Sequence, residues 1–358
     1  MKHLGKLAAG VALALMACGA GAADRSGLSI SLTPSTAKAD MGTGKLRYTI
    51  SNHGKSDLLV LAWETPLRGV DADLFDVRLG GRPVEYVGRE FKRGLPTGDD
   101  YIQINAGASI SMTLDLSAHY DMSAPGEYAA QAHGHFHDAF SLKAARSGDE
   151  SLLPLSDRDV LSETAYLWVD GAEVPYVHDS MDMLSHTKAG SVGFVGCSNT
   201  QQSSIGSGVS AAQSMAANAS AYLATGNAGP RYTTWFGTYS SSNYNTVKSN
   251  FVAIGDALNN KPLVFDCSTC TQNAYAYVYP SQPYKVYLCG AYWKAPTSGT
   301  DSKGGTTIHE VSHFNVVAGT DDLAYGQTAC KRLAGNPKRA IKNADSHEYF
   351  AENTPSLN

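Results

Sequence analysis

The chain has 358 residues, 17% of them charged, and a formal net charge of −5 at pH 7. This length is enough for two domains, and the charge excludes the dense basic stripe of a nucleic-acid-binding protein. After the first residues, no stretch approaches the ~20 consecutive apolar residues of a transmembrane helix. We therefore expect neither a nucleic-acid partner nor a membrane span.

The first 23 residues have the features of a secretory signal peptide. Lys2 and Lys6 precede an apolar core at 7–17, and Ala-Gly-Ala at 20–22 is a small-residue cleavage site. We predict that residues 1–23 are removed and that the protein is secreted. The alternative is a lipoprotein box at 15–18 with Cys18 acylated, but Met16 fits that box poorly.

Charge and cysteine content divide the remaining chain. Residues 24–188 hold 15 Lys and Arg against 24 Asp and Glu, whereas residues 189–358 hold 11 against 9. All five cysteines after Cys18 lie in the second part, where export would allow disulfides and leave one thiol over. We predict two domains, 24–187 and 188–358, whose opposite net charges favour association.

The first of these domains has the pattern of short strands. Apolar residues alternate at 46–50 and 110–116, a buried run covers 57–63, and 76–87 is a hairpin with Gly-Gly at its turn. Short strands separated by turns predict an all-β immunoglobulin-like sandwich. A fold class by itself says nothing about function.

The second domain mixes helices and strands. Residues 190–208 are rich in Gly, Ser, Asn and Gln, which predicts a linker or the start of a new domain, and 209–226 is an Ala-rich helix that ends at a glycine. Residues 273–293 alternate aromatic and small side chains, as in a short edge hairpin. The last 50 or so residues predict helices, so the domain is α+β.

The stretch "HEVSH" at 309–313 carries metal-binding chemistry. His309 and His313 are four residues apart, so on a helix both imidazoles project toward one ion. Glu310 lies one step round, where it can hold a metal-bound water.

The third ligand distinguishes classes of zinc peptidase. A metzincin would have histidine at 319 and glycine at 316, but the chain has Gly319 and Val316. Asp322 follows a glycine that can turn the chain back toward the metal. Its carboxylate can complete a set of three ligands and leave the fourth position to water. Tyr325 can reach the same region with its phenol.

"HEVSH" followed by "GTDDLAYG" at 319–326 resembles the signature of the aspzincin, or deuterolysin-type, zinc metallopeptidases. Every defined position of His-Glu-x-x-His and Gly-Thr-x-Asp-x-x-Tyr-Gly matches, and the resemblance extends over about residues 190–358. Within the family it is closest to the peptidyl-Lys metalloendopeptidases. It implies a zincin-like catalytic domain with one Zn²⁺ on His309, His313 and Asp322. It also implies that Glu310 is the general base and that Tyr325 donates to the oxyanion.

The motif "NADSHEYFAEN" at 343–353 contains Asp345 and Glu348, whose carboxylates share one face if the segment is helical. Taken alone, the pattern favours an Asp near a helix start and a solvated Glu. The resemblance implies instead that both line the pocket for lysine after the scissile bond. Cleavage is then expected on the N-terminal side of lysine in protein and peptide substrates.

The resemblance also implies two disulfides, Cys197 with Cys267 and Cys270 with Cys289. One feature departs from the family pattern: two residues separate Cys267 from Cys270, where one is usual. Cys330 is then the free thiol, which we expect to be buried.

A secreted zymogen is the function that these features favour. Residues 24–187 lack the zinc motif and have the opposite net charge, which suits an inhibitory pro-domain, although a permanent accessory domain would also fit. Self-cleavage at Thr187–Lys188 would release the catalytic domain. The alternatives are a broad deuterolysin-like protease with a mild basic preference, and a non-catalytic adhesin or binding protein. The intact Glu310 and Tyr325 argue against the second alternative.

Overall fold

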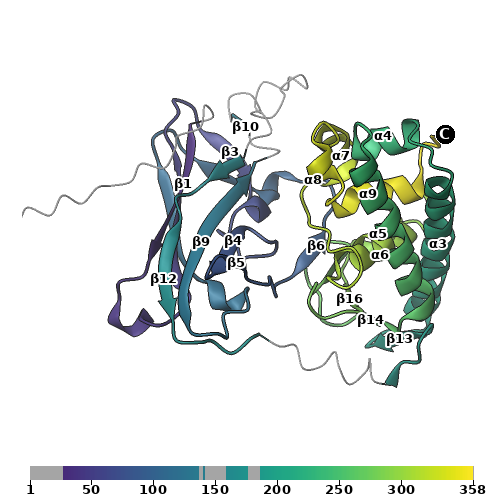
Figure 1. Cartoon of the computed structure of the whole chain (residues 1–358), viewed down its shortest axis with the longest axis horizontal. Helices are drawn as coiled ribbons and strands as arrows, with labels where there is room; N and C mark the ends of the chain where they lie inside the picture. Colours follow the sequence, from purple (N-terminus) through teal and green to yellow (C-terminus); the bar gives the residue numbers. More distant parts are fainter. Residues whose placement is uncertain (1–26, 137–139, 142–158, 176–185, 358) are drawn as a thin grey trace, which may run out of the picture.

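The structure, a computed structural model, describes residues 27–136, 140–141, 159–175 and 186–357; the predicted signal peptide and Cys18 lie outside these ranges. The chain forms two lobes side by side (Figure 1): an N-terminal lobe (residues 27–175) and a C-terminal lobe (residues 186–357). Each lobe has its own hydrophobic core, one drawn from residues between Leu28 and Val169 and the other from residues between Ile205 and Ala351.

The N-terminal lobe is mostly β-strand, as the alternation predicts. Strand β2, for example, buries Leu46, Tyr48 and Ile50 on one face. The predicted hairpin forms, with Gly80 and Gly81 at φ +58° and +80°, values that suit glycine in a tight turn. The strands described in this lobe form three sheets. The first contains β1 (Leu28–Pro34), β2 (Lys45–Asn52) and β8 (Ser109–Asp115), and the second contains β3 (Leu58–Leu61), β7 (Tyr101–Ile104) and β10 (Phe140–Ser141). The third contains β4 (Phe75–Leu79), β5 (Arg82–Pro83), β9 (Gly126–His135), β11 (Asp159–Leu161) and β12 (Ala165–Val169).

The C-terminal lobe is built on a five-stranded sheet in the order β13-β14-β16-β15-β6. Four strands are its own: β13 (Val192–Val195), β14 (Leu263–Asp266), β15 (Ala276–Val278) and β16 (Lys285–Leu288). The fifth, β6 (Glu90–Lys92), comes from the N-terminal lobe and pairs antiparallel with β15. The predicted hairpin at 273–293 is therefore present, but its strand β15 is an inner strand, because β6 covers the expected edge.

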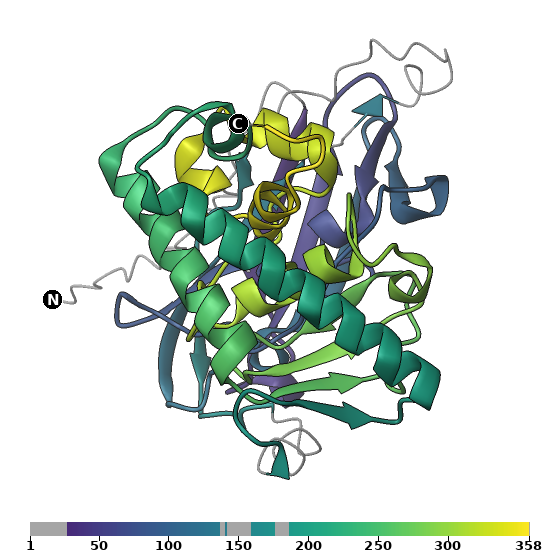
Figure 2. The ribbon, with the colours of Figure 1, turned by 90° about the vertical axis from the view of Figure 1, so that its right-hand side faces the viewer.

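Seven helices are described in this lobe. They are α3 (Asn199–Ala224), α4 (Pro230–Phe236), α5 (Ser241–Asn260), α6 (Lys303–His313), α7 (Gly326–Leu333), α8 (Pro337–Ala340) and α9 (Ala344–Glu352). Figure 2 shows the long helices α3 and α5 on the side turned away from the N-terminal lobe. None of the helices in the described ranges has both the length and the apolar character needed to cross a membrane.

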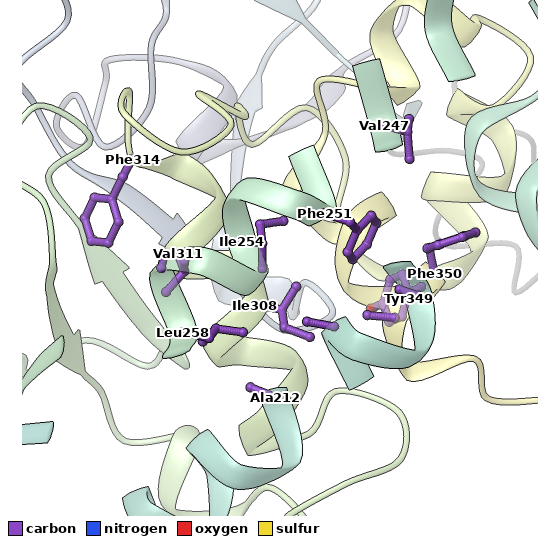
Figure 3. Close-up of a cluster of buried hydrophobic side chains, with 14 of the residues drawn as sticks. Ala212, Val247, Phe251, Ile254, Leu258, Ile308, Val311, Phe314, Tyr349 and Phe350 are labelled. Carbon is purple, nitrogen blue, oxygen red and sulfur yellow. The ribbon is translucent and has the colours of Figure 1, made fainter. Parts of the chain in front are cut away.

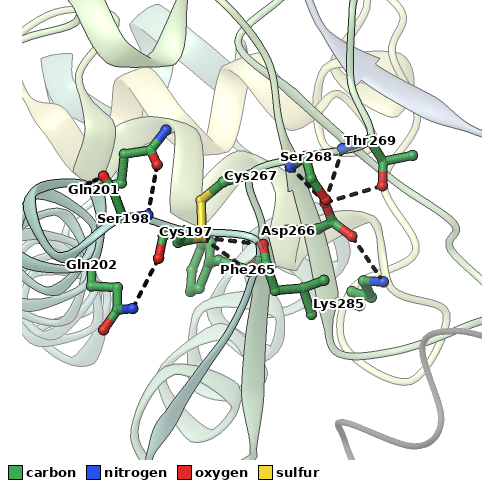
Figure 4. The surroundings of a disulfide bond; sticks show 11 residues. Cys197, Ser198, Gln201, Gln202, Phe265, Asp266, Cys267, Ser268, Thr269 and Lys285 are labelled. Carbon is green, nitrogen blue, oxygen red and sulfur yellow. Dashed lines mark hydrogen bonds and ion pairs between the residues drawn. A yellow bond between two sulfur atoms is a disulfide. The ribbon is translucent and has the colours of Figure 1, made fainter.

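Of the two predictions for residues 190–208, the start of a new domain fits better than a linker, because β13 lies at Val192–Val195 and α3 begins at Asn199. Ser198 and Gln201 form a reciprocal capping box, in which each side chain accepts the other residue's amide N–H, at 3.3 and 2.9 Å. This start lies beside the disulfide Cys197–Cys267 (Figure 4). The polar composition at 199–208 belongs to the exposed side of a helix, and a capping signal was overlooked.

Candidate active site

Helix α6 positions the two histidines. The hydroxyl of Ser302 caps its first turn by accepting the amide N–H of Gly305 at 2.9 Å. Ile308 and Val311 pack into the hydrophobic core (Figure 3). His309 and His313 project together from another face, with ring centroids 4.8 Å apart, and both are fully buried.

A turn after α6 brings Asp322 to these imidazoles. Gly319 has φ +54°, a left-handed conformation that glycine adopts without strain, and its amide donates to the carbonyl of Phe314. Asp322 Oδ1 then lies 3.1 Å from His309 Nε2 and 3.5 Å from His313 Nε2. The third residue predicted to bind metal is therefore brought to the first two.

The donor atoms of this cluster fit a metal ion. His309 Nε2, His313 Nε2 and both carboxylate oxygens of Asp322 are buried, and none has a partner with hydrogen-bond geometry in the described part of the chain. His313 Nδ1 is 2.7 Å from the carbonyl of Thr320, which fixes the ring and leaves Nε2 as the ligand atom. Two imidazoles and one carboxylate are donors that zinc accepts, with a fourth position left open.

The charge at this point is also suited to a cation. Burial by itself lowers the pKa of His309, but the carboxylates of Asp322, Asp345 and Glu348 together outweigh it and hold that pKa well above its usual range. The pKa of Asp322 is lowered: burial would raise it, but His313 and His309 have the larger combined effect. The pocket therefore favours positive charge between these side chains, as a bound metal would supply.

Asp345 lies behind the metal-binding residues. Its Oδ1 is 2.8 Å from His309 Nδ1, and its Oδ2 accepts the amide N–H of Gly326 at 2.7 Å. A carboxylate on the far nitrogen of a ligating histidine sets the ring's tautomer and orientation. Asp345 thus contacts the candidate metal centre indirectly, a connection that its place in the sequence does not reveal.

Glu348 lies one turn further along α9 and faces the same space. Both Asp345 and Glu348 are fully buried, so the reading of Glu348 as a solvated side chain is wrong. Gly305 allows this approach: a Cβ there would lie 2.8 Å from Glu348 Oε1 and still closer to Glu352. A glycine inside α6 therefore lets the carboxylates of α9 pack against it.

The peptide bond between Phe91 and Lys92, in β6, crosses the centre of this site. The Tyr325 hydroxyl donates to the carbonyl oxygen of Phe91 at 2.8 Å. The amide N–H of Lys92 donates to Glu310 Oε1 at 3.3 Å. Burial raises the pKa of Glu310 to about 7, so this carboxyl is suited to exchange protons near neutral pH.

The side chain of Lys92 fills a pocket beside the histidines. It is fully buried, and its ammonium lies 2.7 Å from Glu348 Oε2, 3.3 Å from Asp301 Oδ1 and 3.4 Å from Asp345 Oδ1. The rings of Tyr275 and Tyr349 lie 5.1 and 5.7 Å away. Burial alone would lower the pKa of this ammonium, but the three carboxylates hold it well above its usual range.

Phe91, Lys92 and Asp301 were not identified from the sequence. The signal that could have found the first two is "REFKRG" at 89–94, three basic residues within the acidic first half. Asp301 follows a loop of Ser, Gly and Thr and gives no sequence signal of its own. Only the fold brings it to the pocket.

The cysteines pair as the resemblance implied. Disulfides join Cys197 to Cys267 and Cys270 to Cys289, so the unusual spacing between Cys267 and Cys270 does not change the pairing. Cys330 is a free, buried thiol, and burial raises its pKa well above the usual range. It therefore packs as an apolar group, as expected.

Comparison with known proteins agrees with the geometry. Residues 221–352 match the aspzincin family model, described as lysine-specific metallo-endopeptidase. An extracellular protease of Aeromonas hydrophila is 43% identical over 88% of this chain and 89% of its own length. A peptidyl-Lys metalloendopeptidase of Grifola frondosa is 35% identical over 97% and 98%. The solved structure of a zinc peptidase from Grifola frondosa, 51% identical, covers 45% of this chain and 100% of its own, with a TM-score of 0.44.

Proposed function

Because the chain belongs to the aspzincin family of zinc metalloendopeptidases, we propose that it cleaves before lysine and is made as a zymogen inhibited by its N-terminal lobe. One observation carries this proposal: the buried Lys92 ammonium among Glu348, Asp301 and Asp345. The peptide bond before that lysine lies at Glu310 and Tyr325. We infer that β6 occupies the position that a bound substrate peptide would take.

The residues around this bond have complementary chemical roles. A zinc ion held by His309, His313 and Asp322 would activate water for attack and polarise the carbonyl. Glu310 takes a proton from the attacking water and delivers it to the lysine amide nitrogen, which it already contacts. Tyr325 donates to the carbonyl oxygen as negative charge develops there, which typically contributes about 3 kcal/mol.

The pocket favours lysine for geometric and electrostatic reasons. Its three carboxylates surround the ammonium nitrogen, each with an oxygen 2.7–3.4 Å from it. That arrangement suits a compact ammonium, whereas the planar guanidinium of arginine is longer and needs a paired, side-by-side geometry. A neutral side chain would leave the buried carboxylates without a partner, which is costly. We therefore assign the position after the scissile bond to lysine.

The pro-domain corresponds to residues 24–187 and the catalytic domain to residues 188–358. The separate cores and the covered active site support this division. Further contacts hold the lobes together, including Asn315 to Glu85 at 2.7 Å and Arg339 to Asp159 at 3.3 Å. We retain the immunoglobulin-like sandwich as the proposed class of the pro-domain, on the strength of its short antiparallel strands.

Maturation at Thr187–Lys188 is proposed to occur between molecules. Lys188 precedes β13, which lies at the opposite edge of the five-stranded sheet from β6. Four strand spacings separate these edges, roughly 19 Å. The pocket of the same molecule, filled by Lys92, is therefore out of reach of Lys188. A second, already active molecule must cut there.

Export is part of the proposal. It is supported by the predicted signal at 1–23 and by the two disulfides, which persist in oxidising compartments. Anchoring through Cys18 stays the less favoured alternative.

Mapping of cleavage sites tests the proposed specificity. Matured enzyme should digest a denatured protein to fragments that begin with lysine, as read by mass spectrometry, and a chelator should abolish digestion. Fragments that begin with many residue types would favour the broad deuterolysin-like alternative. No digestion by metal-loaded protein would favour the non-catalytic binding protein.

A further inference from the structure

The residue before the lysine is also held by the C-terminal lobe. Phe91 is fully buried, and it belongs to a small cluster with Ala274, Tyr277, Tyr287 and Cys289. Those four residues come from the C-terminal lobe, whereas Phe91 comes from the N-terminal lobe. Successive strand residues point to opposite faces, so Phe91 enters this cluster while Lys92 enters the acidic pocket.

The cluster is a stack of aromatic rings across the sheet. Phe91 lies opposite Tyr277 in the pairing of β6 with β15, and Tyr277 lies opposite Tyr287 in the pairing of β15 with β16. The ring centroids of Phe91 and Tyr277 are 4.8 Å apart, and those of Tyr277 and Tyr287 are 4.5 Å apart and nearly parallel, at 3°. Both separations favour aromatic attraction in addition to apolar burial.

The two tyrosines are held in place independently of Phe91. The Lys285 ammonium lies 4.6 Å from the Tyr287 ring and is paired with Asp266 at 3.1 Å. The Cys270–Cys289 disulfide borders the same cluster. Since these supports belong to the C-terminal lobe, the Tyr277 ring is preorganised to receive a side chain at the Phe91 position.

We propose that Tyr277, backed by Tyr287 and the Cys270–Cys289 disulfide, forms a second specificity subsite that prefers an aromatic or large apolar residue immediately before the lysine. The preferred substrate is then a Phe-Lys, Tyr-Lys or Leu-Lys sequence. This inference rests on the proposed function, because it assumes that the Phe91–Lys92 peptide bond lies where the scissile bond of a substrate would lie. An acidic residue at that position would lose its hydration on an apolar ring and is disfavoured.

A peptide series tests the subsite on enzyme matured from the full chain. Peptides differ only in the residue before one lysine, which is Phe, Leu, Ala or Asp, and kcat/KM is measured for each. We expect Phe to exceed Ala by about tenfold or more, with Asp lowest. Cleavage before lysine with values for Phe, Ala and Asp within about twofold of one another would overturn the subsite. Absence of cleavage before lysine would overturn the proposed function instead.

Variants locate the preference. Tyr277→Ala should bring the Phe-to-Ala ratio close to one, Tyr277→Phe should retain it, and Tyr239→Ala is the matched control. Tyr239 is a 52% exposed aromatic on the same lobe, outside the cluster. An unchanged ratio in Tyr277→Ala would overturn the assignment to Tyr277. If that variant does not fold, the peptide series and the following measurement still decide.

A further readout needs no catalysis. The two variants compared are Phe91→Ala and Phe91→Tyr, each made in the full chain carrying Glu310→Gln. Added trypsin should cleave after Lys92 or Arg93 at least several-fold faster in Phe91→Ala than in Phe91→Tyr. Equal rates for the two variants would contradict the role of the aromatic contact.

Discussion

At the scale of single residues, Asp345 and Glu348 differ more than their shared motif suggests. Asp345 is 2.8 Å from His309 Nδ1 and is also fixed by the amide of Gly326. Glu348 makes the shortest contact with the lysine ammonium, at 2.7 Å, and is 3.4 Å from His309 Nδ1. One carboxylate therefore belongs mainly to the metal centre and the other mainly to the lysine pocket.

Substitution should separate these two roles. We expect Glu348→Gln to lower kcat/KM for lysine substrates by about 10- to 100-fold, as for a lost charge-assisted hydrogen bond, with zinc affinity little changed. Asp345→Asn should weaken zinc binding by about 10- to 100-fold as well. Peptide kinetics and competition with a zinc chelator measure the two effects. Equal zinc affinities in the two variants would show that Asp345 does not orient His309.

The catalytic roles divide in a similar way. Glu310→Gln should keep zinc but lower peptide hydrolysis by about 10²-fold or more, and Tyr325→Phe should lower kcat by about 10²-fold with zinc retained. Asp322→Ala should lose zinc affinity as well as activity. Metal content by atomic emission, measured beside kcat, distinguishes these outcomes. Native-rate hydrolysis by Glu310→Gln would refute its role as base.

At the scale of secondary-structure elements, β6 is the strand that joins the lobes. It completes the sheet on β15 (Figure 1), and its Lys92 ammonium contacts Asp345 and Glu348 of α9. Edge strands of a sheet bind extended peptides by backbone pairing. The chain's own β6 therefore covers β15, the strand on which we propose that a substrate pairs.

Shortening the Lys92 side chain tests the proposed inhibition of the active site by the N-terminal lobe. We expect full-length Lys92→Ala to hydrolyse an added lysine peptide without a lag, because the buried carboxylates lose their ammonium partner. Lys92→Arg should be intermediate, and Lys55→Ala, a lysine of the same lobe outside the pocket, is the control. The lag before activity, followed with a fluorogenic peptide, is the measurement. A lag as long as that of the native chain would contradict inhibition by Lys92.

At the scale of the whole molecule, acidic groups gather at the interface between the lobes, where Glu90 is buried and Asp73 is exposed. The packing of protein around Asp73 removes part of the water near its carboxyl and raises its pKa to about 7, although the side chain keeps contact with solvent; the hydroxyl of Tyr120 acts in the opposite direction, and Asp321 adds to the rise. Glu90 accepts the amide N–H of Asp73, and burial raises its pKa as well. The stability of the full chain should therefore depend on pH.

The raised pKa of Asp73 sets the direction in which stability changes with pH. Its ordinary value is 3.8, so the folded state favours the protonated form, and the stability it contributes is lost as pH rises from about 4 to about 7. Asp73→Asn, made in the Glu310→Gln chain, removes this titration. We expect the variant to gain stability relative to its parent above pH 7, by about 1 kcal/mol or less, because Asp73 is exposed and water screens its charge. Parallel urea curves at pH 5 and 8 measure it, and a difference independent of pH would contradict the assignment.

Processing between molecules gives a second whole-molecule prediction. Cleavage at Thr187–Lys188 should accelerate with protein concentration, and active enzyme should cut the Glu310→Gln chain there when added in trans. N-terminal sequencing identifies the product. A rate independent of concentration would instead indicate cleavage within one molecule.

The local sequence was sufficient for features that depend on neighbouring residues. Helical spacing put His309 and His313 on one face, Gly319 allowed the turn to Asp322, and alternation revealed the strands of the first half. The start of α3 was missed because its capping residues lie within a polar stretch typical of a linker. The pairing of Phe91 and Lys92 with a pocket more than 200 residues away depended on the tertiary structure alone. No local pattern encodes which lysine reaches Glu348, because that contact arises from the packing of two separately built cores.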